Sequence, residues 1–239
     1  MVMATTQSGQ SEQHLSPDDP RVARPIFTLR EAAGYLGVPK STVHEWARPS
    51  AGRSPLITVF PRHGREATVP FLGFAEAYVL STFCRAGVPF QRIRPAVEVL
   101  SFEIGIEHAL ASERLYTDGA EVLFEYASER RDDELLELVA PRTGQYQFSE
   151  LVRDYLRRIT YGGDGWASHV QLPIYGRAGV VVDPLVAFGL PILTNGGARV
   201  EDLVDRFLAG DTVTDIADDF AVPADQVEDV IRVATRTAA

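Results

Sequence analysis

The first regular pattern of hydrophobic and polar positions along the chain predicts two short helices. Apolar residues recur at helical spacing at Leu29, Ala32, Ala33 and Leu36. Thr28 and Glu31 have the spacing of a capping box, and Gly37 suits a helix end because glycine adopts a left-handed backbone at little cost. A second helix is expected over residues 40–47, with Val43 and Trp46 on its buried side. The pattern is typical of a helix-turn-helix.

The segments that follow predict a wing and then a series of short elements. β-branched runs at residues 56–60 and 67–69 flank a Pro/Gly turn, so we expect a hairpin directly after the helix-turn-helix. Apolar periodicity and glycine stops predict helices over residues 72–86, 89–102, 148–159 and 200–209. Shorter apolar runs predict strands over residues 115–117, 121–126, 170–175, 180–183 and 191–193.

The helix-turn-helix pattern returns near the end of the chain. Thr212 and Asp215 repeat the cap, Val222 and Pro223 repeat the turn, and Val227 repeats the buried position of the second helix. Each of these residues follows its counterpart in the first copy by 184 positions. The repeated positions are caps and core positions, so they specify a fold and carry no information about a ligand.

These elements predict a mainly α protein with short β hairpins, divided into four segments. Residues 1–24 are rich in Ser, Gln, Thr and Pro and are expected to form a disordered tail. Residues 25–104 are expected to form a winged helix-turn-helix, and residues 105–165 a connecting region with short strands and one helix. Residues 166–239 are expected to form a C-terminal dimerisation and partner-binding domain, in which short strands precede the second helix-turn-helix.

The charge is distributed unevenly along the 239 residues, whose formal net charge is −10. Residues 21–70 carry eight basic and three acidic side chains, a net +5. Residues 194–239 carry four basic and ten acidic side chains, a net −6. Attraction to phosphate is local, so a basic end can bind DNA although the whole chain is acidic. The asymmetry indicates two surfaces with different partners.

The exposed positions of the two copies predict which one binds DNA. A recognition helix must offer hydrogen-bond donors to phosphates and base edges. The candidate DNA-binding residues lie in the first copy and in the turn of the wing; they are Arg30, Lys40, Ser41, Thr42, His44, Arg48, Arg62, His63 and Arg65. The second copy places Asp225, Glu228 and Asp229 at the corresponding exposed positions, where they would repel DNA. We therefore expect the second copy to bind protein.

Several stretches resemble known families. Residues 28–46 read TLREAAGYLGVPKSTVHEW and resemble the opening of the MerR-type winged helix, and residues 83–94 read FCRAGVPFQRIR and resemble the helical pair that follows its wing. The C-terminal part resembles a small domain family often found in antitoxins, through the stretches VVDP (181–184), FGLP (188–191), RVEDL (199–203) and GDTVTDIADDF (210–220). The combination is similar to a VapB-type antitoxin of a type II toxin–antitoxin pair.

This resemblance implies a homodimer or a higher even-numbered oligomer, repression of its own operon through operator DNA, and a PIN-like ribonuclease toxin as partner. An acidic C-terminal unit suits a basic RNA-binding partner, because opposite fields speed association. The resemblance also implies that an arginine can lie against the metal-binding carboxylates of the toxin. The candidates are Arg157, Arg158 and Arg177.

Two other hypotheses also fit the sequence. In the first, the chain is a stand-alone MerR-like transcriptional regulator that senses a small molecule through its middle and C-terminal parts. In the second, it is a protein adaptor in which both helix-turn-helix units are structural. A nuclease that copurifies favours the antitoxin, and a ligand-induced shift in thermal stability favours the sensor.

The sequence gives no pattern for catalysis, metal binding or membrane insertion. No two of the five histidines have metal-ligand spacing, and no phosphate-binding loop, nucleophile elbow or dinucleotide fingerprint appears. The single cysteine, Cys84, excludes an internal disulfide and is expected to be a buried small hydrophobe. We therefore expect a cytoplasmic protein that is not an enzyme, has no cofactor and does not associate with a membrane.

Overall fold

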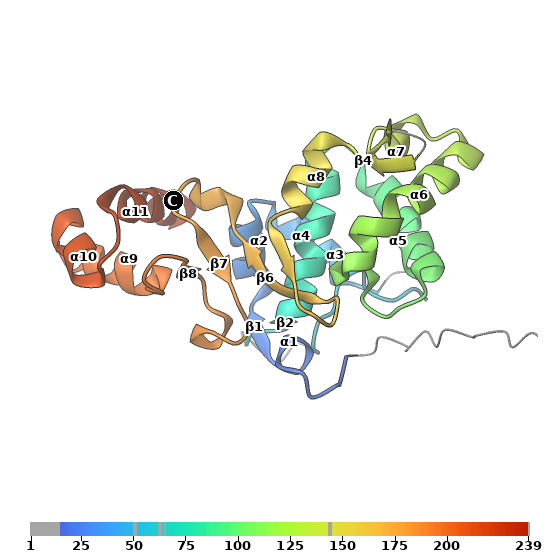
Figure 1. The fold of residues 1–239 in the computed structure, drawn as a ribbon. Helices are drawn as coiled ribbons and strands as arrows, with labels where there is room; N and C mark the ends of the chain where they lie inside the picture. Colours follow the sequence, from blue (N-terminus) through green and yellow to red (C-terminus); the bar gives the residue numbers. More distant parts are fainter. Residues whose placement is uncertain (1–14, 50–51, 62–63, 65, 143–144, 239) are drawn as a thin grey trace, which may run out of the picture.

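A computed structural model gives the structure of residues 15–49, 52–61, 64, 66–142 and 145–238. These residues form a mainly helical protein with three small antiparallel sheets, which confirms the predicted fold class. In Figure 1, α4 (Phe71–Arg85) runs through the middle of the molecule. The helices over residues 90–136 lie to its right, and most of a four-stranded sheet and the C-terminal helices lie to its left.

The first helix-turn-helix forms as the sequence predicts. It consists of α2 (Leu29–Leu36) and α3 (Lys40–Trp46). Thr28 and Glu31 form the reciprocal capping box, and Gly37 ends α2 in the left-handed region at φ 64°. Val43 and Trp46 are fully buried, so the side of α3 that carries them packs into the core.

The wing differs from the predicted hairpin. Residues 56–60 form no strand, and among the described residues one backbone hydrogen bond, from Phe60 N to Thr68 O at 2.8 Å, joins the two arms. The second arm instead contributes β2 (Val69–Pro70), which pairs with β1 (Pro25–Phe27), a strand that the sequence pattern did not indicate. The arm turns away because Thr68 N also donates to Phe27 O, at 2.9 Å.

The middle of the chain is more helical than expected. The structure contains α5 (Phe90–Ile104), a short 3-10 turn η1 (Ala109–Ala111) and α6 (Glu113–Arg130). The predicted strands over residues 115–117 and 121–126 are wrong, because both runs lie inside α6. A helical stripe of small and apolar residues packs α6 against α5 and overrides the local preference for strand; its buried members are Leu115, Gly119, Ala120, Leu123 and Ala127.

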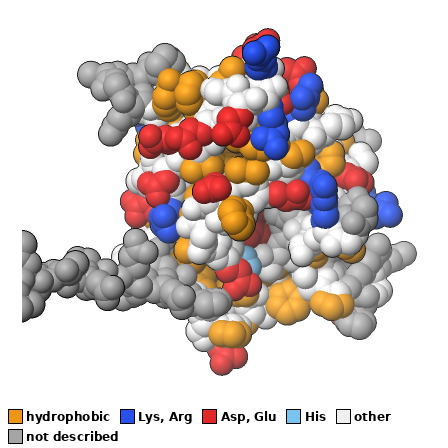
Figure 2. Space-filling view, turned by 90° about the vertical axis from the view of Figure 1, so that its right-hand side faces the viewer, with side chains coloured by type: hydrophobic (Ala, Val, Ile, Leu, Met, Phe, Trp, Pro, Cys, Tyr) orange, Lys and Arg blue, Asp and Glu red, His pale blue; other side chains and the backbone are white. Residues whose placement is uncertain are grey.

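Short elements complete this helical part. They are α7 (Asp133–Leu136), the hairpin β3 (Val139–Arg142) and β4 (Gln145–Phe148), and α8 (Glu150–Leu156). The helix expected over residues 148–159 is thus shorter at both ends. Figure 2 shows the side of the molecule that carries α5 and α6, where acidic and basic side chains are interspersed with hydrophobic ones. This face carries no broad region of one charge among the described residues.

A four-stranded antiparallel sheet links the two halves of the molecule. It has the order β5-β6-β7-β8 and contains β5 (Ile159–Tyr161), β6 (Ala167–Gln171), β7 (Val180–Val182) and β8 (Ile192–Leu193). The sequence predicted β7 and β8 but placed the strand before them at residues 170–175, which is too late in the chain: β6 begins at Ala167, and residues 173–175 form a 3-10 turn, η2 (Pro173–Tyr175). A further 3-10 turn, η3 (Ala187–Gly189), connects β7 and β8.

Three helices end the chain. They are α9 (Val200–Leu208), α10 (Val213–Phe220) and α11 (Ala224–Ala238). All three pack on one another, and α11 also packs against η2. The second helix-turn-helix, α10 and α11, therefore lies at the opposite end of the sheet from the helices α5 and α6 (Figure 1).

The end of the expected disordered tail is ordered, which corrects that boundary. Residues 20–23 form α1 (Pro20–Ala23), which Asp19 caps. Arg21 pairs with Asp164, at 2.5 Å, in the turn before β6. Residues 1–14 lie outside the described part of the chain.

Candidate nucleic-acid interface

The two helix-turn-helix units share their local geometry. Thr28 Oγ1 accepts from Glu31 N at 3.2 Å, and Thr212 Oγ1 accepts from Asp215 N at 3.1 Å. Gly37 has φ 64° and ψ 36°, and its counterpart at position 221 has φ 52° and ψ 43°. The residue after each of these left-handed caps donates its N–H back to the first helix, at 3.1 Å and 3.0 Å. The repeated sequence template therefore specifies the same turn twice.

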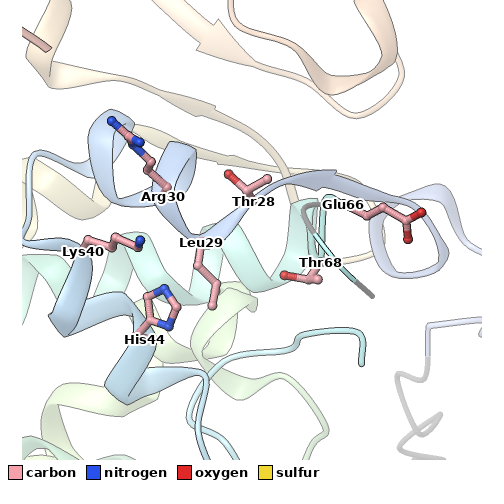
Figure 3. A pocket seen from close by; sticks show the side chains of 8 residues that line it. Thr28, Leu29, Arg30, Lys40, His44, Glu66 and Thr68 are labelled. Carbon is pink, nitrogen blue, oxygen red and sulfur yellow. The ribbon is translucent and has the colours of Figure 1, made fainter. Parts of the chain in front are cut away.

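A groove lies between α2, α3 and the second arm of the wing. Its volume is about 470 Å³, and it is lined by Thr28, Leu29, Arg30, Lys40, His44, Gly64, Glu66 and Thr68. Figure 3 shows Lys40 and His44 extending from α3 toward Leu29. The Arg30 side chain points away from Lys40, and Glu66 lies on the far side of the groove. Three predicted DNA-binding residues, Arg30, Lys40 and His44, therefore line the same groove.

Most of the predicted DNA-binding residues of the first copy reach solvent. Arg30, Lys40, Ser41 and Arg48 are exposed, and Thr42 and His44 are half-buried. Arg30, Lys40 and Arg48 have no ion-pair partner among the described residues. The predictions for Arg62, His63 and Arg65 lie outside the described residues.

The exposed face of α11 is arranged differently. Arg232 pairs with Asp229 at 2.5 Å and lies 3.9 Å from Glu228, so it offsets two of the three predicted carboxylates. Asp229 is mostly buried, at 16% exposure, and a Cβ added at Gly176 would lie 3.6 Å from its Oδ2. Asp225 and Glu228 are exposed. Position by position, Asp225 and Glu228 of α11 stand where α3 has Ser41 and His44, and Ala224 stands where α3 has Lys40. The exposed face of α11 therefore carries more acids than that of α3 and lacks one of its cations.

The three arginines that were candidates for contact with a toxin do not form one cluster. Arg157 follows α8 and pairs with Asp154 at 3.3 Å. Arg158 is half-buried, with its guanidinium 5.9 Å from the centre of the Tyr155 ring. Arg177 follows η2, is exposed, and has no ion-pair partner among the described residues.

Two polar contacts that the sequence did not reveal position the helix-turn-helix and the wing on α4. Arg85 Nη2 donates to Leu36 O at 2.7 Å, where α2 ends in the turn. Glu76 is 4% exposed and accepts the backbone N–H of Thr58, in the first wing arm, at 2.5 Å. Gly73 lets this arm approach, because a Cβ at Gly73 would lie 2.0 Å from Thr58 O.

A histidine joins this buried contact. His108 Nδ1 lies 3.0 Å from Glu76 Oε1 and 2.9 Å from Thr58 Oγ1. Burial lowers the pKa of His108, but the hydrogen bond and charge of Glu76, together with the charge of Glu107, outweigh this effect and raise the pKa above its usual range. Both contacts use the same ring nitrogen, so His108 links Glu76 on α4 to the side chain of Thr58 in the first wing arm.

Within the described residues, no three His, Cys, Asp or Glu side chains are grouped so that they could hold a metal ion. None of the helices described is both long and apolar enough to pass through a bilayer.

Comparisons with known proteins find similarity to both the N-terminal and the C-terminal part of the chain. Residues 25–97 match the family described as "Putative DNA-binding HTH domain", and residues 180–234 match the family described as "Protein of unknown function (DUF433)". The chain is 44% identical over 222 residues to "Putative antitoxin VapB45" of Mycobacterium tuberculosis, covering 87% of this chain and 92% of that protein. The crystal structure of Rv2018 from Mycobacterium tuberculosis matches with a TM-score of 0.80 and 44% identity, over 88% of this chain and 99% of that one. This extent of similarity shows that the chain belongs to the VapB-type antitoxin family.

Proposed function

We propose that this antitoxin neutralises a PIN-like ribonuclease by direct binding and represses its own operon by binding operator DNA with α2, α3 and the wing. The single observation that carries the proposal is the contrast between two units of the same geometry. The exposed face of the first carries cations without ion-pair partners among the described residues, and that of the second carries acids. In this account the protein acts by binding and has no catalytic role.

The DNA part follows from the chemistry of α2 and α3. Phosphates attract cations that are not already neutralised, and each contact releases counterions. Arg30, Lys40 and Arg48 supply such cations, and Ser41 and Thr42 add short hydroxyl donors. His44 lines the groove beside Lys40, and we assign it to a base edge. Arg62, His63 and Arg65 add basic residues to the sequence of the wing turn.

The partner part follows from charge and from the availability of an arginine. Ten acidic residues within positions 194–239 give this unit a field that suits a basic RNA-binding enzyme. Asp225 and Glu228 present the exposed carboxylates of α11 to such a partner, with Asp229 beside them. Among the three candidate arginines, Arg177 is the one whose charge is exposed and not offset by a described acid, so we assign it to the carboxylates of the toxin.

The assembly is proposed to be a homodimer or a higher even-numbered oligomer. Winged-helix proteins read paired half-sites, and symmetric DNA then requires symmetric protein. One copy offers about six candidate donors from α2 and α3, and two copies double the number of phosphate contacts and thereby strengthen the salt dependence of binding.

A pair of assays in cells separates the two functions. A reporter placed behind the DNA upstream of the gene measures repression, and growth during expression of the neighbouring nuclease measures neutralisation. The double variant Lys40→Ala/Arg48→Ala should lose repression and keep neutralisation. Arg177→Ala should lose neutralisation and keep repression. Arg157→Ala is the matched control and should keep both functions, because the guanidinium that it removes already pairs with Asp154. Repression by the folded Lys40→Ala/Arg48→Ala protein at the wild-type level would contradict the DNA assignment.

A further inference from the structure

A second hollow lies between the DNA-binding unit and the C-terminal helices. It has a volume of about 550 Å³, and its walls come from α2, η2, the segment before β8, α9 and the end of α11. Concave sites for small molecules span about 300–1,000 Å³, whereas a protein partner needs an interface of about 800 Å² on each side. The size of this cleft therefore fits a small organic molecule.

The floor of the cleft is apolar and aromatic. Tyr35 from α2, Ile174 from η2 and Val204 from α9 line it, together with Tyr175, Leu190 and Pro191. Tyr35 and Ile174 are half-buried, so part of their apolar surface faces the cleft. A ligand with an aromatic or aliphatic body would cover this surface and remove it from water.

The rim carries more negative than positive charge. Glu31 lies on one wall, and Glu201 and Asp205 lie one helical turn apart on the other, against the single described lining cation, Arg30. The neighbouring Arg199 is held by two hydrogen bonds to Asp202 and so adds no net charge. Burial, with the charges of Glu31 and Glu201, raises the pKa of Tyr35 to about 12. The local potential is therefore negative.

The stability of α9 gives no reason for an acidic residue at Asp205. An acid in the first turn of a helix is stabilised by the helix dipole, which accounts for Glu201. Asp205 lies beyond that turn, four positions after Glu201, where like charges destabilise a helix slightly. It has no ion-pair partner among the described residues.

We infer that this cleft is a binding site for a small organic cation with an apolar body. The body lies over Tyr35, Ile174 and Val204, and the cationic group lies between Glu31, Glu201 and Asp205. Thr28 and Arg30 line both this cleft and the groove beside α3. A bound cation adds positive charge next to the DNA-binding face and strengthens DNA binding; this last step rests on the proposed function.

Three indole compounds of equal bulk but different charge test the site on the full-length chain. The probes are tryptamine, which is a cation, tryptophol, which is neutral, and indole-3-acetate, which is an anion. Isothermal titration should show tryptamine binding at least tenfold more tightly than tryptophol, and no binding of the acetate. Equal binding of tryptamine and tryptophol, or no binding of tryptamine, would overturn the inference.

Variants locate the binding in the cleft. Glu201→Gln/Asp205→Asn should weaken tryptamine about tenfold and leave tryptophol unchanged, because the two substitutions remove both α9 carboxylates from the rim and only tryptamine carries a charge. Val204→Trp fills the floor and should abolish binding of both compounds. Asp218→Asn, an exposed acid on α10, is the matched control and should change neither. Wild-type affinity for tryptamine in the Glu201→Gln/Asp205→Asn variant would overturn the assignment even if Val204→Trp does not fold.

The effect on DNA is a separate measurement. Saturating tryptamine should raise the affinity for operator DNA about fivefold, a factor at the lower end of the coupling found between linked sites. If tryptamine bound without any change in DNA affinity, the coupling between the cleft and DNA binding would be refuted, whereas the assignment of the cleft as a binding site would stand. Tryptamine binding to a chain that binds no DNA would contradict the proposed function alone.

Discussion

Replacing Glu76 with glutamine should loosen the first wing arm from α4. The carboxylate is 4% exposed and accepts from Thr58 N at 2.5 Å through one oxygen, while the other oxygen lies 3.0 Å from His108 Nδ1. Glutamine keeps the shape but has one oxygen, so its NH₂ group must face one of these two donors. A hydrogen bond to a charged group contributes about 1.5–3 kcal/mol, so the free energy of unfolding should fall by about 2 kcal/mol.

The loss should depend on pH with a defined sign. The folded pKa of His108 is raised, so the folded state binds its proton more tightly than the unfolded chain does. The corresponding stabilisation is complete below pH of about 6.5, the ordinary value for histidine, and is lost as the pH rises through the raised pKa. Glu76→Gln removes the main cause of the raised value, so the variant and the wild type should differ most at acidic pH.

Urea unfolding, followed by tryptophan fluorescence at about pH 5.5, 7 and 8.5, measures both effects. The wild type should lose stability across this range, and Glu76→Gln should lose much less. Glu107→Gln is the matched control, because Glu107 is 62% exposed and its nearest oxygen lies 3.8 Å from His108 Nε2. If the free energy of unfolding of Glu76→Gln lay below that of the wild type by the same amount at all three pH values, the role of the Glu76–His108 pair would be refuted.

Three further changes test the local geometry. Gly73→Ala should destabilise the protein by about 3 kcal/mol in a denaturant titration, because overpacking is costly and the new Cβ meets Thr58 O at 2.0 Å. Thr28→Ala and Thr212→Ala each remove a helix cap and should each lower stability by about 1 kcal/mol, but only Thr28→Ala should weaken DNA binding in a gel-shift assay. Arg85→Met removes the hydrogen bond to the end of α2 and should lower both the melting temperature and DNA affinity; unchanged DNA affinity would contradict its positioning role.

The sequence predicts best where the signal is local. Thr28, Glu31 and Gly37 fix both ends of α2 through contacts between residues three or four positions apart in the chain, and the N-terminal cap repeats at Thr212 and Asp215. Capping and left-handed turns depend on neighbours in the chain, so one sequence suffices to find them. The charge contrast between α3 and α11 is also readable from the sequence, because exposed positions follow from the buried ones.

The sequence predicts poorly where distant segments decide the structure. β-prone runs near Leu115 and Leu123 become helix because α5 offers a face for a helical stripe to pack on. The second wing arm leaves its partner because residues 25–27 compete for its hydrogen bonds. Glu76 and His108 are 32 positions apart and meet only after α4 and η1 pack, so no spacing rule could have paired them.

The salt dependence of operator binding tests most directly whether the first unit, and not the second, binds DNA. The logarithm of the affinity should fall linearly with the logarithm of the salt concentration, with a slope of about −0.9 for each phosphate contact. Lys40→Ala/Arg48→Ala should make this slope shallower by about 1.8 per chain, and Asp225→Ala/Glu228→Ala should leave it unchanged. The account would be contradicted if Lys40→Ala/Arg48→Ala left the slope unaltered. It would also be contradicted if DNA binding failed only when the α11 carboxylates were replaced.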